Sequence, residues 1–171
     1  ATLDSSNPST ISASNTTVYL GIPLSGVADG NEVLSLSFAE NSLFDLAGNV
    51  VSSTTVELNL YDNVASKIVS TSLSETNTQV LVVFSEALGQ IDNDDILLSI
   101  ANGTASLLAS TPLSISAVNS LTYMVELPLS GEVSGDEIVT IGIASGTLVD
   151  LEGNQVTQEQ TNNTVQLKDT T

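Results

Sequence analysis

Apolar and polar residues alternate along short stretches of the chain, and turn-forming residues separate these stretches. Ile138–Ile143 shows this period of two through Val139, Ile141 and Ile143, and Gln79–Phe84 is an apolar stretch rich in Val that also predicts a strand. Asn102-Gly103 separates Asp95–Ala101 from Thr104–Ser110 and predicts a two-residue hairpin, because both turn residues tolerate positive φ. The pattern predicts strands, since no stretch of useful length repeats every 3.6 residues. Further strands are expected at Lys67–Ser72, Ser114–Val118, Leu121–Leu127 and Asn163–Lys168.

The chain also contains an internal repeat. Ile22–Gly26 returns as Leu127–Gly131, and Asp45–Asn49 returns as Asp150–Asn154, each with a shift of 105 residues (127 minus 22). Matches that keep one order along the chain predict a duplicated structural unit. Other matched positions have shifts of 104 to 107, so short insertions separate the blocks. They pair Asp29–Glu32 with Ser134–Glu137, Tyr19 with Tyr123, Leu60 with Leu167 and Asp62 with Asp169.

The two copies of the repeat are not equally complete. Residues 63–169 hold a whole unit, whereas residues 1–62 match only its second half, from Ala105 onward. The first copy therefore lacks a counterpart of residues 63–104. Three explanations are open: the sequence begins within a unit, the mature chain is processed there, or a neighbouring chain supplies the missing strands. The last is physically reasonable because an open sheet edge can accept an added strand.

About eight short strands in roughly 105 residues are typical of a Greek-key sandwich of the immunoglobulin type. We therefore expect an all-β protein of tandem immunoglobulin-like Greek-key β-sandwich modules. The module at 63–169 should be complete, and the one at 1–62 should be an incomplete C-terminal half that needs strands from upstream sequence or from another chain.

Two blocks of the repeat resemble a known family. Val82–Leu88 (VVFSEAL), followed by Asp92–Asp95, resembles the opening of bacterial Ig-like repeats, of the kind found in cyanobacterial swimming-motility proteins and other large surface proteins and adhesins. The end of that repeat is similar to Gly135–Ile141 and the turn Asp150–Asn154. The resemblance covers residues 66–157. It implies large exported proteins of the cell surface, in adhesins, S-layers or filaments, with no shared catalytic residues.

Composition argues against catalysis. The chain has no Cys and no His, which removes the thiol nucleophile, the imidazole base and the usual zinc ligands. Paired carboxylates can hydrolyse glycosidic bonds, but such sites usually hold sugar rings on aromatic side chains. Aromatic residues make up only 4% of this chain and Trp is absent. We therefore expect a protein that is not an enzyme.

The charge limits the possible partners. Twenty acidic residues face only two basic ones, Lys67 and Lys168, which gives a net charge of −18. Nucleic acid is excluded because binding to its phosphates needs Lys and Arg, and attraction to an anionic membrane fails for the same reason. No apolar run is long enough to insert directly into a membrane. The expected partners are copies of the chain or neighbouring Ig-like modules, with a glycan or protein ligand left open.

Acidic residues suggest candidate calcium sites. Asp92, Asp94 and Asp95 form the densest acidic run, and Glu86 ends the preceding strand, so their oxygens could bind Ca²⁺. The run lacks the spacing of an EF-hand. The alternative is a solvated loop in which Asp94 or Asp95 caps a turn. Asp150 and Asp62 are weaker candidates. The alternatives there are a tight turn with Gly153 in the left-handed conformation and an ordinary polar linker.

These observations predict a non-catalytic structural repeat of an extracellular surface protein, filament or adhesin, with strand complementation between chains as one mode of assembly. The alternative is a calcium-dependent adhesion module that recognises a glycan or a protein.

Overall fold

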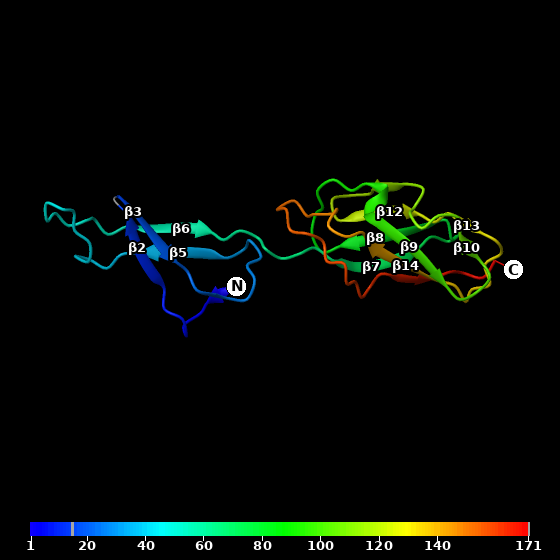
Figure 1. The fold of residues 1–171 in the computed structure, drawn as a ribbon, viewed down its shortest axis with the longest axis horizontal. Coiled ribbons are helices and arrows are strands. Elements are labelled where there is room, and N and C mark those ends of the chain that lie inside the picture. Colours follow the sequence, from blue (N-terminus) through cyan, green and yellow to red (C-terminus); the bar gives the residue numbers. More distant parts are fainter. Residues whose placement is uncertain (15, 171) are drawn as a thin grey trace. The chain divides into compact units, whose positions relative to one another are not determined.

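The computed structural model describes residues 1–14 and 16–170 and divides the chain into two compact units (Figure 1). Unit 1 is Ala1–Val64 and unit 2 is Ala65–Thr171. The repeat placed the boundary between residues 62 and 63. Within the described residues, the only helical element is one 3-10 turn, η1 (Asn93–Asp95), so the predicted all-β class is confirmed.

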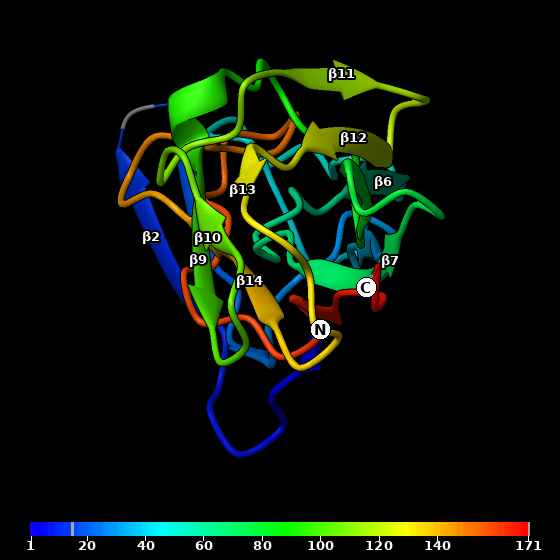
Figure 2. The same ribbon diagram turned by 90° about the vertical axis from the view of Figure 1, so that its right-hand side faces the viewer.

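Unit 2 contains two main antiparallel sheets. Figure 2 shows β11 beside β12 and β9 beside β14. The four-stranded sheet has the order β11-β12-β8-β7, and the three-stranded sheet has the order β15-β14-β9. A short third pair joins β10 to β13. The strands are β7 (Ile68–Leu73), β8 (Gln79–Phe84), β9 (Ile96–Ala101), β10 (Ser106–Leu107), β11 (Ile115–Ala117), β12 (Thr122–Glu126), β13 (Leu129–Ser130), β14 (Ile138–Ile143) and β15 (Thr164–Gln166).

The two sheets of unit 2 enclose one aliphatic core. Val80 and Val82 of β8 alternate inward, and so do Val139 and Ile141 of β14, and all four are fully buried. Phe84 contacts Tyr123 of β12 edge to face, with the ring centroids 5.9 Å apart. Because both sheets contribute to the same cluster, the unit is β-sandwich-like, held by the burial of apolar surface.

The predicted hairpin around Asn102-Gly103 is wrong in its pairing, although the turn itself forms. Asn102 and Gly103 both have positive φ, at 63° and 60°. However, β9 pairs with β14, and β10 pairs with β13. The reason lies just beyond the turn, where the backbone N–H groups of Thr104 and Ala105 donate to the buried carboxylate of Glu137. The segment after the turn still lies beside β9, since the Leu98 N–H donates to the Ser110 carbonyl, but the ladder partner of β10 is β13.

Unit 1 consists of three separate antiparallel strand pairs, β1-β4, β2-β3 and β5-β6 (Figure 1). Ala28 is the only buried apolar residue among the described residues of this unit. Its strands therefore have no aliphatic core of their own. They are β1 (Thr2–Leu3), β2 (Thr10–Ser14), β3 (Thr17–Gly21), β4 (Leu24–Ser25), β5 (Val33–Ser37) and β6 (Thr55–Asn59).

The second half of unit 2 has the same backbone hydrogen bonds as unit 1. The Leu60 N–H donates to the Glu32 carbonyl at 3.0 Å, and the Leu167 N–H donates to the Glu137 carbonyl at 2.9 Å. Equivalent strand pairs also recur, with β1, β2, β3, β4, β5 and β6 corresponding to β10, β11, β12, β13, β14 and β15. The duplication seen in the sequence is thus also present in the backbone.

One matched pair from the sequence is corrected by the strand register. Ser12 faces Tyr19 across β2 and β3, and the equivalent Ser116 faces Met124 across β11 and β12. Tyr19 therefore corresponds to Met124, and Val18 corresponds to Tyr123. The connection between β2 and β3 is one residue shorter than the connection between β11 and β12. Equivalent residue numbers in the two units therefore differ by 104 in β2 and by 105 in β3.

Candidate functional site

Within residues 1–14 and 16–64, two strand edges lack the neighbours that their equivalents have in unit 2. In unit 2, β12 lies between β11 and β8, and β14 lies between β15 and β9. In the described part of unit 1, the equivalent strand β3 pairs only with β2, and β5 pairs only with β6. The edges along Thr17–Gly21 and Val33–Ser37 therefore present backbone groups that no other described strand pairs with. Such edges can accept a further strand.

Apolar side chains beside these edges are exposed, whereas their equivalents in unit 2 are buried. Leu43 is 40% exposed and Leu148 only 1%; Leu58 is 51% exposed and Val165 only 8%. The positions are the same in the backbone, and in unit 2 they share one core with residues of β7, β8 and β9. We call this surface the open face. It comprises Val18, Ile22, Leu43, Val51 and Leu58, whose unit 2 equivalents are Tyr123, Leu127, Leu148, Val156 and Val165.

Equivalent glutamates, Glu137 fully buried and Glu32 partly buried, bind backbone nitrogens at the start of the second half of the repeat. In unit 2, Glu137 is fully buried, and its Oε1 accepts the N–H groups of Thr104 at 2.8 Å and Ala105 at 2.9 Å. It also accepts bonds from Ser134 and Gly135. In unit 1, the Glu32 carboxylate forms an ion pair with the Ala1 amino group and accepts the Asp29 N–H. Glu32 and Glu137 thus hold equivalent backbone nitrogens.

These hydrogen bonds favour the ionised form of Glu137. The Ala105 N–H contributes most, with those of Thr104 and Ser134, and together they lower the pKa of Glu137 from 4.5 to about 2. The sequence analysis matched the glutamates of both copies but did not assign them this role. A glutamate that directly follows a Gly-containing turn and precedes an alternating strand, in both copies, is the signal that would have revealed it.

We predict that Glu137 makes unit 2 acid-sensitive. Because its pKa is lower in the folded state, its contribution is complete above about pH 5 and is lost as the pH falls from 4.5 towards 2. Glu137→Gln should lower the free energy of unfolding at pH 7 and flatten its decrease over this range, measured by urea unfolding at successive pH values. The exposed Glu132→Gln is the control, and an unchanged pH profile in Glu137→Gln would contradict the assignment.

The repeated D-x-x-G-N motif forms a tight turn in both units. Oδ1 of Asp150 accepts the N–H groups of Glu152 at 3.0 Å and Asn154 at 2.8 Å, and Oδ2 accepts the Asn154 side-chain amide. Asp45 makes the equivalent bonds in unit 1. Gly153 has a φ of 92°, as the left-handed position requires. The Asp150 carboxylate is buried and already receives three N–H donors, which gives it a structural role in the turn.

The acidic run forms a capped turn. Asp92 precedes η1, and its backbone N–H donates to Oδ2 of the buried Asp95 at 2.7 Å. Asp92 and Asp94 are exposed, and Glu86 is partly buried. The geometry thus matches the alternative interpretation, in which Asp95 caps the turn.

The Asp62 side chain also makes a local hydrogen bond to the backbone: its Oδ1 accepts the Val64 N–H at 2.8 Å. Over residues 1–14 and 16–170, no group of three or more acidic side chains lies close enough to hold a metal ion. Calcium at Glu86, Asp92, Asp94 and Asp95, or at Asp62 or Asp150, stays a prediction.

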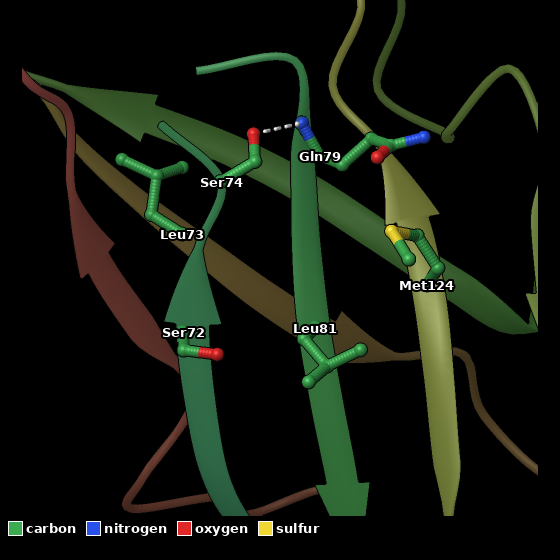
Figure 3. A pocket seen from close by; sticks show the side chains of 6 residues that line it. All are labelled: Ser72, Leu73, Ser74, Gln79, Leu81 and Met124. Atoms are coloured by element: carbon green, nitrogen blue, oxygen red, sulfur yellow. Dashed lines mark hydrogen bonds between the residues drawn. The ribbon is translucent and has the colours of Figure 1, made fainter. Parts of the chain in front are cut away.

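Unit 2 has a shallow hollow on the outer side of its four-stranded sheet. Figure 3 shows Leu81 of β8 and Met124 of β12 side by side, with Leu73 of β7 nearby. The hollow has a volume of about 310 Å³ and no charged side chain in its lining. The dashed line marks the Gln79 N–H donating to Ser74 Oγ at 3.1 Å, which closes the β7-β8 turn.

None of the described segments forms a helix of the length and apolarity needed to cross a membrane. Comparisons with protein-family models, with curated proteins and with solved structures find no match to this chain.

Proposed function

We propose that this chain is a non-catalytic structural part of a repeat protein on the cell surface, in a filament, an adhesin or a similar extracellular assembly. The observation that carries the proposal is the recurrence of the same backbone hydrogen bonds and turns in the two units. Repeats of one structural unit are typical of proteins that extend, link or project other parts of an assembly.

The strand order of unit 2 supports an immunoglobulin-like Greek-key module. If β7, β8, β9, β11, β12, β14 and β15 are lettered A to G in chain order, the sheets become A-B-E-D and C-F-G. This is the order of an immunoglobulin constant-type domain. The short strands β10 and β13 pair with each other and have no letter in this assignment.

The electrostatics support a structural role for the acidic residues. A hydrolase with two carboxyl groups needs one whose pKa is raised, so that it can donate a proton. Here the carboxyl pKa is instead lowered at five positions, Asp4, Glu32, Asp45, Glu75 and Glu137. Hydrogen bonds and ion pairs cause these shifts, as expected for carboxylates that hold turns and strand ends in place.

The mechanical role can be tested by stretching single molecules of the full chain between two reference domains. Unit 2 should unfold in one step with a resolvable force peak and release about 35–38 nm of chain, from its residue count and about 3.3–3.6 Å per extended residue. Extension without a force peak would contradict a load-bearing role.

Labelling of intact source cells with an antibody against unit 2 tests the proposed surface location. Absence of labelling before the cells are lysed would contradict that location.

A further inference from the structure

The four-stranded sheet of unit 2 ends at β11, which pairs only with β12 among the described strands (Figure 2). The Ser114 carbonyl accepts an N–H of β12 at 3.0 Å, and the Val118 N–H donates to a carbonyl of β12 at 2.8 Å. Since antiparallel strands bond through every second residue, the intervening Ile115 and Ala117 direct their N–H and carbonyl groups away from β12. These outward groups form an edge to which a further strand can add.

The side chain of Asn93 covers one end of this edge. Its Oδ1 accepts the Ile115 N–H at 3.0 Å, and its Nδ2 donates to the Leu113 carbonyl at 3.3 Å. One amide thus bonds to the carbonyl and the N–H of two residues that flank a third, as a residue of a parallel neighbouring strand does. A further strand cannot bond to these two groups while Asn93 holds them.

The capped turn η1 fixes the position of Asn93. The Asp92 N–H donates to Oδ2 of the buried Asp95 at 2.7 Å, and the Asp95 carbonyl accepts the Ala144 N–H at 2.8 Å. The second bond ties the turn to the residue that follows β14. The acidic run thus holds a neutral amide against the edge of β11.

The edge of β11 lacks the usual protection of edge strands. Natural edge strands are often protected by charged side chains or by Pro, and the residues of β11 include neither. The sequence has no charged residue from 96 to 125, and Leu113 and Val118, at the two ends of β11, are exposed. The equivalent positions beside β2 are Ser9 and Ser14, so the shared backbone does not require apolar residues there.

We propose that Asn93 is an edge lock, which keeps β11 of one chain from pairing with β11 of a second copy. Without the lock, two β11 strands pair antiparallel about a twofold axis, with Ile115 of each copy opposite Ala117 of the other. The two η1 turns then lie at opposite ends of the paired strands. A second copy fits because the neutral edges meet without opposed carboxylates, although each chain has a net charge of −18. This role concerns one edge of unit 2 and is independent of the proposed function.

Hydrogen exchange of the full chain in dilute solution tests the contact that defines the lock. The Ile115 amide should be protected, whereas the Ala117 amide should exchange faster because it faces away from β12. Asn93→Ala should raise the exchange rate of Ile115 to nearly that of Ala117. The amides of β8 and β14 should keep their protection, which shows that the variant is folded. An unchanged Ile115 rate in the folded variant would overturn the assignment.

Sedimentation over a range of concentrations tests whether the contact limits association. Asn93→Ala should strengthen self-association of the full chain by about tenfold or more, because it frees an N–H and a carbonyl at the edge. Gln90→Ala is the matched control and should leave association unchanged. The Gln90 amide donates to the Asp92 carboxylate at 3.1 Å in the same turn and has no bond to β11. Equal association of Asn93→Ala and the unsubstituted chain would overturn the inference.

A double variant identifies the surface through which the copies join. Ala117→Pro removes an outward N–H of β11 and no bond to β12. Combined with Asn93→Ala, it should return self-association to the level of the unsubstituted chain. Association that persists in the double variant would place the contact on another surface and would overturn the proposed edge pairing.

Discussion

Removal of residues 1–64 is expected to leave the thermal unfolding midpoint of unit 2 almost unchanged, while unit 1 alone should show no cooperative unfolding. All 19 residues of the core cluster belong to unit 2. Unit 1 buries only Ala28 among its described apolar residues. A chain segment of this size without a core cannot offset the conformational entropy that folding costs. The expected shift of the midpoint is below about 4 °C, which corresponds to less than about 1 kcal/mol.

Calorimetry of the intact chain provides the quantitative measurement. If only unit 2 unfolds cooperatively, the unfolding enthalpy should be about 75 kcal/mol near 60 °C, from about 0.7 kcal/mol per residue. If both units unfold cooperatively, it should be about 120 kcal/mol. The control is the isolated span 65–171, which should give the same enthalpy as the intact chain. A second transition that disappears on removal of residues 1–64 would contradict the prediction.

The bounds of two central strands could be predicted from the sequence to the residue. Gln79–Phe84 and Ile138–Ile143 are the observed bounds of β8 and β14. Each lies in the middle of its sheet, so apolar residues and β-branched residues mark both, by alternation in β14 and by a nearly continuous run in β8. The turn at Asn102-Gly103 was also predictable, because left-handed backbone conformations depend on local residue type.

Strand pairing was less predictable because it depends on distant residues. The sequence predicted that β9 and β10 form a hairpin. However, the N–H groups of Thr104 and Ala105, just after the turn, donate to Glu137, which lies more than thirty positions further along the chain. The match of Tyr19 with Tyr123 failed for a related reason. Residue identity suggested that the equivalent numbers differ by 104 at Tyr19. The register across β2 and β3 shows that they differ by 105, because the β2-β3 connection is one residue shorter than the β11-β12 connection.

The candidate site was predictable in outline through the phase of the repeat. Residues 1–62 match only the second half of the unit, which predicted missing strands. The particular edges could not be predicted, because they depend on which strands pair in unit 2. The open face could not be recognised either, since Leu43 and Leu148 occupy the same sequence pattern and differ only in what surrounds them.

The same substitution at these two equivalent positions should have very different effects. Leu148→Ala should lower the free energy of unfolding of unit 2 by about 2–5 kcal/mol, because Leu148 is 1% exposed and its removal leaves a cavity. Leu43→Ala should change the measured stability by less than about 0.5 kcal/mol, since Leu43 is 40% exposed. Urea unfolding of both full-length variants measures the difference.

The two leucines hold equivalent backbone positions: the Leu43 carbonyl accepts the Val51 N–H at 2.9 Å, and the Leu148 carbonyl accepts the Val156 N–H at 3.0 Å. A difference between the variants therefore measures the contribution of the surrounding strands to stability, because residue type and local backbone are held constant. Equal losses at both positions would mean that unit 1 already has a core in the isolated chain.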